Sequence, residues 1–467
     1  MRFTNNYKDK IKKIVEDKNL TYYIDTMGCS MNENDSSKYA GILESIGFKR
    51  EENEEKANLI LFNTCCIREN AENTLFGRFG TVKKYKMNNE NVYIVVVGCM
   101  TQQKHIIEKI KKSYRFVDIT LGTGAMNSFP SKLYDLLNEK KKNIEFVEVT
   151  NEIEEEVPIK YDSKYKASVS IIYGCNNFCS YCIVPYVRGR ERSRRPKDIL
   201  NDVKELAKEG YKEIMLLGQN VNSYGNDFKD TNYSFPNLLQ DIEKIDGIEI
   251  IRFMSPHPKD FSDELIDVIK SSKKIARQIH LPLQSGSSKI LKEMNRKHTK
   301  EDYLKIVNKL KNADENISIS TDIIVGFPGE TEEDFLDTLD VVKKVKFDQI
   351  YMFIYSKRVG TRAEKMEDNT PEEEKVRRLE RIKEIYEEYL PENNKKMIGK
   401  TYKVLVEGVS KNNDKLLTGR TSQNKVVIFD GDKSNIGEIV NVEILSEHLW
   451  YLKGKICLLY TSDAADD

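Results

Sequence analysis

Short apolar runs alternate with helix-like segments along most of this chain, and the alternation restricts the fold more than any other feature. In the first part, strand-like runs occur at residues 22–26, 58–63, 92–97 and 116–121. Helix-like segments lie at 34–45, 70–86, 102–112 and near 131–138. Strands that alternate with helices predict a parallel sheet of the α/β class.

A longer alternation of the same kind begins near residue 167. Its strand-like runs are 167–173, 213–217, 249–254, 278–283, 318–325 and 349–355. Six such units predict a partial, TIM-like (β/α)6 barrel, whose active site is expected at the carboxyl ends of the strands. Polar loops follow these runs, and their candidate cofactor contacts are Gly218, Gln219, Asn220, Asn222, Gly326 and Glu330. His257 is a polar contact or a proton carrier, but a structural role is favoured, as it is for His280.

The pattern changes again after a charged helix. We predict that this helix is capped by Thr370, has Pro371 at its first position, and ends near residue 390 before Pro391. Five short strand-like runs follow, at 402–406, 416–419, 426–429, 438–444 and 451–455. They predict a small closed β-barrel of the OB type.

These patterns divide the chain into units. We expect a charged extension at 1–19, an α/β domain at 20–140, an acidic linker at 141–162, the partial barrel at 163–391 and the small barrel at 394–456. The tail at 457–467 does not continue the pattern and need not be native. Basic and acidic residues both number 75, so a nucleic-acid surface has to be local. Without a secretory signal or a long apolar run, the expected location is the cytoplasm.

Two sets of three cysteines stand out. Cys175, Cys179 and Cys182 form C-x3-C-x2-C, whereas Cys29, Cys65 and Cys99 each follow a strand-like run of the first domain. Thiolates are the usual ligands of iron–sulfur clusters, and three of them leave one iron of a four-iron cluster open. A structural zinc ion requires four ligands. The alternative for either set is buried, unreactive thiols.

Two further features accompany these sets. Cys66 adjoins Cys65 and is interpreted as structural, with its side chain directed away from that of Cys65. A basic run follows Cys182, and it contains Arg188, Arg190, Arg192, Arg194, Arg195 and Lys197. It is either a solvated face or a contact for the phosphates of RNA.

The cysteine motifs resemble those of a known family. The segment 173–182 is similar to the signature of radical S-adenosylmethionine enzymes, and 183–191 resembles their methylthiotransferase branch. The segments 28–36, 63–65, 67–69 and 98–100 resemble the N-terminal motifs of MiaB-type tRNA-2-methylthio-N6-dimethylallyladenosine synthases. Gly419, Arg420, Thr421, Asn424 and Val427 match the central motif of the TRAM domain, an RNA-binding barrel.

The resemblance implies an enzyme that converts N6-(dimethylallyl)adenosine at position 37 of tRNA to its 2-methylthio derivative. It implies two [4Fe-4S] clusters, one on each cysteine set, and S-adenosylmethionine. The basic run and the TRAM-like motif together predict tRNA contacts by Arg188, Arg190, Arg192 and Arg420. An electron donor such as flavodoxin or ferredoxin and a sulfur source are the expected partners of a monomer. The alternatives are a sister enzyme acting on N6-threonylcarbamoyladenosine or a ribosomal protein and, more remotely, a non-enzymatic metal-dependent RNA-binding protein.

Overall fold

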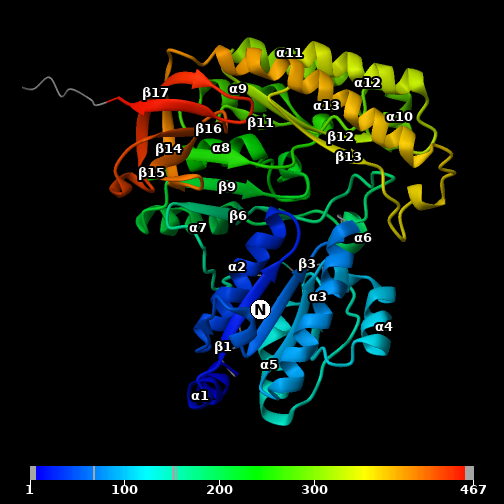
Figure 1. Ribbon diagram of the computed structural model, residues 1–467, viewed down its shortest axis with the longest axis vertical. Coiled ribbons are helices and arrows are strands. Elements are labelled where there is room, and N and C mark those ends of the chain that lie inside the picture. The colour runs from blue at the N-terminus through cyan, green and yellow to red at the C-terminus, as the bar shows by residue number, and fades with distance from the viewer. Residues whose placement is uncertain (1–6, 67–68, 150–152, 154, 458–467) are drawn as a thin grey trace, which may run out of the picture.

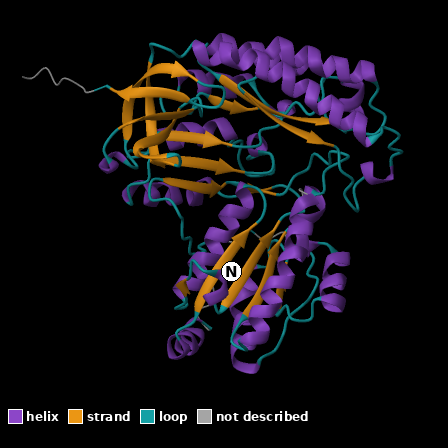
Figure 2. Cartoon of the chain, in the orientation of Figure 1, coloured by secondary structure: helices purple, strands orange, loops and turns teal. Residues whose placement is uncertain are grey.

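A computed structural model describes residues 7–66, 69–149, 153 and 155–457. Figure 1 shows an α/β domain below a larger barrel, with a small β-barrel at one end of the larger one. Figure 2 shows that helices cover the outside of both α/β units. No helix within the described ranges is long and apolar enough to cross a membrane.

The first domain contains a parallel sheet in the order β2-β1-β3-β4-β5. Its strands are β1 (Thr21–Thr26), β2 (Lys49–Arg50), β3 (Leu59–Thr64), β4 (Tyr93–Gly98) and β5 (Ile119–Leu121). Its helices are α2 (Ser30–Ser45), α3 (Glu69–Asn88), α4 (Lys104–Ser113) and α5 (Phe129–Glu139). Every residue of β3 and β4 is buried, because helices pack on both faces of the sheet. The strand order reverses between β1 and β3, and in such sheets ligands bind beyond the carboxyl ends at that point.

The charged segment before β1 is not only an extension. Within its described part, helix α1 (Lys8–Lys18) buries Ile11 and Val15 in the core of the first domain and packs against α5. The spacing of these two apolar residues places them on one face of a helix, while the lysines face solvent. Residues 1–6 lie outside the described ranges.

The predicted partial barrel is confirmed. Six parallel strands form two sheets, β6-β9-β10 and β11-β12-β13, and the parallel bridge between Ile251 and Ile275 links the two sheets. The strands are β6 (Lys166–Ser170), β9 (Glu213–Leu217), β10 (Ile250–Phe253), β11 (Gln278–His280), β12 (Ser318–Val325) and β13 (Gln349–Ile354). The outer helices are α7 (Pro196–Lys208), α8 (Phe235–Glu243), α9 (Asp263–Ser271), α10 (Ser288–Glu293), α11 (Lys300–Ala313) and α12 (Glu332–Val345).

The first strand of the barrel is interrupted where the cysteine loop begins. β6 ends at Ser170, and β7 (Ile172–Tyr173) then pairs antiparallel with β8 (Arg192–Ser193). The short helix α6 (Val184–Arg188) lies between these two strands in the sequence. The cysteine loop and α6 are therefore held by a small hairpin at the carboxyl end of β6.

The long charged helix α13 differs from the prediction at both ends. It spans Glu372–Lys395, with Pro371 rather than Thr370 at the N-cap position, and it continues through Pro391. Its last turn is held by tertiary contacts, because the Asn394 amide donates to the carbonyls of His448 and Leu449. These contacts offset the backbone hydrogen bond that proline removes.

The C-terminal unit is a closed barrel in the order β14-β15-β16-β18-β17. Its strands are β14 (Thr401–Ser410), β15 (Asn413–Thr421), β16 (Val426–Asp430), β17 (Ile439–Glu447) and β18 (Leu452–Ile456). Cys457, which the sequence assigned to the tail, still donates its N–H to the Asn441 carbonyl.

The small barrel packs against the amino ends of the larger barrel's strands. Arg252 donates to the carbonyls of Thr421 (3.0 Å) and Ser422 (3.1 Å), and Ser318 donates to that of Gln423 (3.0 Å). The turn after β15 therefore closes the base of the larger barrel, at the end opposite the cysteine loop (Figure 1).

Candidate active site at the facing ends of two domains

The C-x3-C-x2-C loop is held tightly by the segment that follows α10. Ser180 donates its N–H to the Met294 carbonyl (3.0 Å), and the Asn295 amide donates to the carbonyls of Asn177 (3.2 Å) and Phe178 (2.8 Å). Phe178 has a φ of 47°, a region that an aromatic residue rarely adopts. The contacts from Asn295 compensate for that strain and hold the loop in this conformation.

The thiols of this loop are close enough to influence one another. Burial raises the pKa of Cys175 to about 12 and that of Cys182 further, and the charge of Cys179 raises both. The buried Arg296 places Nη1 3.8 Å from the Cys179 sulfur and donates through Nη2 to the Pro282 carbonyl (3.0 Å). Arg296 was not among the predicted site residues, because a single basic residue in a polar segment carries no specific signal in the sequence.

The second set of cysteines meets at the carboxyl ends of β1, β3 and β4. Cys29 stands at the N-cap position of α2, and its sulfur donates to Asn32 Oδ1 (3.3 Å). A Cβ on Gly28 would lie 2.8 Å from the Cβ of Cys65. Cys99 donates its N–H to the Thr64 carbonyl (2.9 Å). Burial raises the pKa of Cys29, and the charge of Cys99 raises it further. The structure thus brings the three cysteines together at the switch point of the sheet.

Both sets fit a thiolate-ligated cluster in the chemistry of their donors. All six cysteines are free of disulfide bonds, and each set has a buried arginine beside one sulfur. In the described part of the chain, no three His, Cys, Asp or Glu side chains gather around a position suited to one metal ion. A four-iron cluster does not require that arrangement, because each cysteine binds a different iron. The assignment of the six ligands remains a prediction.

The structure corrects the prediction for Arg188. Its side chain is buried; Nε donates to the Cys99 sulfur (3.1 Å), and Nη2 donates to Asp35 Oδ2 (2.8 Å). A guanidinium engaged in this way is not presented to an RNA phosphate. The sequence placed Arg188 in a basic run but gave no sign that α6 crosses to the first domain.

The other members of the basic run point in different directions. Arg190 is exposed and lies 4.3 Å over the Phe178 ring, and Arg192 is half-buried and donates to the carbonyls of Arg188 and Arg190. Arg194 is buried against Glu155 and Asp202. The run is therefore not one basic face, and RNA contacts by Arg190 and Arg192 remain a prediction.

Arg420 lies at the junction of the two barrels. Its Nε is 3.3 Å from Glu407, and its Nη1 donates to the Asn424 carbonyl (3.2 Å). It lines a cleft of about 550 Å³ between the three units, together with Arg50, Lys160 and Arg252. Its contact with RNA also remains a prediction.

The expectation that Cys66 points away from the cysteine site is wrong. The chain bends at Cys66, so the alternation of an extended strand does not apply, and the Cys66 thiol hydrogen-bonds with Cys99. This hydrogen bond lowers the pKa of Cys99, with help from Arg188, and raises the pKa of Cys66. Residues 67 and 68, which carry part of the family motif, lie outside the described ranges.

In the loop that follows β9, some side chains bond within the protein and others keep an unpaired acceptor among the described residues. The Asn222 side chain donates to the His257 carbonyl (3.0 Å) and accepts from the His257 N–H (2.7 Å). These two bonds fix the next loop. The Asn220 amide donates to Asp260 (2.7 Å). The side-chain oxygens of Gln219 and Asn220 are buried without a hydrogen-bond partner among the described residues. These two acceptors suit a ligand's donors, whereas Asn222 has a structural task.

His257 behaves as a structural residue. It is buried, its Nδ1 accepts a hydrogen bond from the Lys259 N–H (3.1 Å), and burial lowers the pKa of its imidazole. A buried neutral imidazole with one nitrogen occupied in this way matches the favoured structural interpretation.

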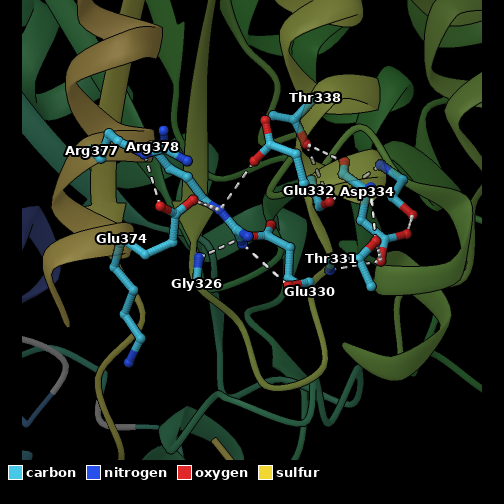
Figure 3. A network of polar contacts seen from close by, with 12 residues as sticks. Gly326, Glu330, Thr331, Glu332, Asp334, Thr338, Glu374, Arg377 and Arg378 are labelled. Carbon is cyan, nitrogen blue, oxygen red and sulfur yellow. Dashed lines mark hydrogen bonds and ion pairs between the residues drawn. The ribbon is translucent and has the colours of Figure 1, made fainter. Parts of the chain in front are cut away.

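The loop after β12 is bound to helix α13, as Figure 3 shows. Glu330 accepts hydrogen bonds from the Gly326 N–H and from Arg378, both at 2.7 Å. Burial raises the pKa of Glu330, but the carboxylate is paired with a buried guanidinium. These contacts account for Glu330 without a cofactor, so cofactor binding by Gly326 and Glu330 remains a prediction.

Three family models match successive parts of the chain. The Radical SAM superfamily matches residues 169–342, Uncharacterized protein family UPF0004 matches residues 21–122, and the TRAM domain matches residues 395–457. A tRNA-2-methylthio-N(6)-dimethylallyladenosine synthase of Thermoanaerobacter pseudethanolicus is 52% identical over 449 residues, covering 96% of this chain and 95% of that protein. The protein of the same name from Acetivibrio thermocellus is 49% identical over 451 residues, covering 97% and 93%.

Solved structures share the fold at low sequence identity. The radical S-adenosylmethionine methyltransferase TsrM of Kitasatospora setae has a TM-score of 0.53 at 14% identity, covering 74% of this chain and 77% of that chain. The cobalamin-dependent S-adenosylmethionine radical enzyme OxsB has a TM-score of 0.52 at 13% identity, covering 80% and 57%. These similarities concern the fold alone.

Proposed function

Because this chain belongs to the family of tRNA-2-methylthio-N(6)-dimethylallyladenosine synthases, we propose that it places a methylthio group on a dimethylallyl-modified adenosine of tRNA. It is a radical S-adenosylmethionine enzyme of the methylthiotransferase kind. The substrate position is adenosine 37, and the hydrogen that is replaced is the one on C2 of the base.

One observation carries the proposal. Helix α6 begins two residues after Cys182 of the barrel set and packs, with Ile183, against Cys66 and Cys99 of the first domain. Cleavage of S-adenosylmethionine and delivery of sulfur require separate sites that reach the same base. A short helix between the two cysteine sets supports that arrangement.

We assign one [4Fe-4S] cluster to each set, at Cys175, Cys179 and Cys182 and at Cys29, Cys65 and Cys99. When bound, the two clusters supply the electron that cleaves S-adenosylmethionine and a site for the transferred sulfur. The protein's own residues orient and shield these groups, as is usual for cofactor enzymes. Asn295 fixes the barrel loop, and Arg188 and Arg296 provide positive charge beside the sulfurs.

The remaining groups of the site are assigned to binding. Gln219 and Asn220 offer unfilled acceptors for the cofactor, and Arg190 and Arg192 lie beside the cysteine loop, where RNA has to approach. The TRAM domain supports tRNA as the substrate. We further propose a cytoplasmic monomer that takes electrons from a flavodoxin or a ferredoxin and receives sulfur from a separate source.

The function is tested in tRNA nucleosides. A strain that lacks the family's enzyme is complemented with this chain, and its digested tRNA is analysed by mass spectrometry. We expect 2-methylthio-N6-(dimethylallyl)adenosine to reappear and its precursor to fall. A methylthio derivative of N6-threonylcarbamoyladenosine would assign the chain to the sister activity. No methylthiolated adenosine, despite normal expression, would contradict the proposal.

A further inference from the structure

Helix α6 carries one arginine from the barrel into the cysteine site of the first domain. Arg188 is the last residue of α6 and lies six positions after Cys182 in the sequence. Its Nε is 3.1 Å from the Cys99 sulfur, and its Nη2 is 2.8 Å from Asp35. One side chain thus connects a loop that holds one cysteine set to a cysteine of the other.

The surroundings of Arg188 fix the direction of its guanidinium. Ile183 and Val187 of the same segment pack with Cys66 and Cys99, so the helix is anchored against the first domain. Asp35 is on helix α2, the helix that Cys29 begins, and its carboxylate binds Nη2 of the same guanidinium. Lys38 of α2 lines the same small cavity but donates to the Tyr173 hydroxyl (2.8 Å) instead of to a cysteine.

The interaction of Arg188 with a sulfur has a consequence for electron transfer. The reduction potential of a thiolate-ligated cluster depends on its net charge and on hydrogen bonds to its sulfurs. A buried guanidinium that donates to a ligand sulfur favours the reduced, more negative state. The carboxylate of Asp35 opposes this effect, since it adds negative charge at the same place.

We propose that Arg188 is a positioning residue that sets the reduction potential of the cluster bound by Cys29, Cys65 and Cys99. This inference rests on the proposed function, because it requires a cluster at that site. Arg188 holds Cys99 in place and balances the charge of the sulfurs, while Asp35 fixes the guanidinium. Arg296 lies 3.8 Å from Cys179, so the corresponding contact in the barrel is longer.

The test isolates the cluster of the first domain. Cys175, Cys179 and Cys182 are replaced by Ala in the full chain, which is reconstituted anaerobically with iron and sulfide. The iron content and the midpoint potential of the remaining cluster are measured, the latter by titration followed by electron paramagnetic resonance. Arg188→Gln, Arg188→Lys and Asp35→Asn are compared in this background. Arg195→Gln is the matched control, because Arg195 belongs to the same basic run but is exposed and pairs with Asp230.

We expect Arg188→Gln to shift the midpoint to more negative values, Arg188→Lys to restore part of the shift, and Asp35→Asn to move it to more positive values. Arg195→Gln leaves it in place. A bound cluster whose potential is the same in Arg188→Gln and Arg195→Gln overturns the inference. If Arg188→Gln binds no iron, the positive shift in Asp35→Asn decides, and its absence overturns the inference. Absence of iron in the background chain itself overturns the two-cluster assignment.

Discussion

The cysteines of the barrel lie on one short loop, whereas those of the first domain come from the ends of three strands. Hydrogen bonds with Met294 and Asn295 help to hold the barrel loop. The other site depends on the strand order of a whole sheet and on Arg188 from the next domain. The barrel site, which is local, should therefore respond to substitutions in its loop. The site of the first domain, which is assembled from three strands, should respond to changes in how the domains pack.

The largest effect is expected from removal of the barrel site. Replacing Cys175, Cys179 and Cys182 by Ala removes every thiolate of the loop. Bound iron is expected to fall to about half, since one of the two proposed clusters is lost, and production of 5′-deoxyadenosine is expected to stop. Iron assays and liquid chromatography measure both. Continued cleavage of S-adenosylmethionine would show that the radical site is elsewhere.

Removal of the assembled site is expected to separate the two activities. Replacing Cys29, Cys65 and Cys99 by Ala leaves the barrel loop and its contacts with Met294 and Asn295 unchanged. 5′-Deoxyadenosine should still form after reduction, while methylthiolated adenosine should not appear. Both products are measured from one reaction. Formation of the methylthiolated product by this variant would exclude the first domain from the chemistry.

A smaller effect is expected from loosening the barrel loop. Asn295 has a φ of 56° and donates to the Phe178 and Asn177 carbonyls. Asn295→Ala loses these bonds and puts alanine in a left-handed conformation, which costs about 1–2 kcal/mol. Asn295→Gly also loses these bonds, but glycine adopts the left-handed conformation without strain. We expect about a tenfold slower cleavage of S-adenosylmethionine in the alanine variant, the change that about 1.4 kcal/mol produces.

The glycine variant shows which part of that loss comes from the hydrogen bonds. Its rate is expected to lie between those of the parent chain and Asn295→Ala. The iron bound by the first domain should not change in either variant, because among the described residues the Asn295 amide donates to Asn177 and Phe178 of the barrel loop. An unchanged cleavage rate in both variants would mean that the loop is rigid without this clamp.

Sequence reasoning predicted the two sites to different extents. The cysteines at the strand ends follow from the alternation of strands and helices, because parallel strands end at one edge of a sheet. The direction of a side chain on a short connecting helix does not follow from such a pattern. Arg188, Arg190 and Arg194 are two or more residues apart in one basic run, yet one contacts Cys99, one contacts Phe178 and one contacts Glu155.

Helix boundaries likewise depend on contacts that a local sequence pattern does not predict. Pro391 is a local signal for the end of a helix, but α13 continues because Asn394 is held by the neighbouring barrel. Likewise, the turn at residues 421–425 matches an RNA-binding motif, although it contacts the base of the larger barrel. Domain contacts decided these features, and a single sequence does not reveal which surfaces meet.

The smallest effect is expected at Cys66, which tests how closely the assembled site is packed. Its thiol is buried with Val187 and Ile183 of α6 and hydrogen-bonds with Cys99. Cys66→Ala removes one sulfur atom from this contact, and a cavity of that size costs about 1 kcal/mol. The unfolding midpoint is expected to fall by about 2 °C, whereas bound iron and 5′-deoxyadenosine production should stay near their parent values. Calorimetry and an iron assay measure the difference.

Cys66→Ser preserves the side-chain size and is expected to show a smaller shift of the midpoint. Cys65→Ala, by contrast, should lose the iron of the first domain, because Cys65 is the assigned ligand. If Cys66→Ala loses that iron and Cys65→Ala retains it, the bend of the chain after β3 presents Cys66 to the cluster, and the two neighbours exchange roles.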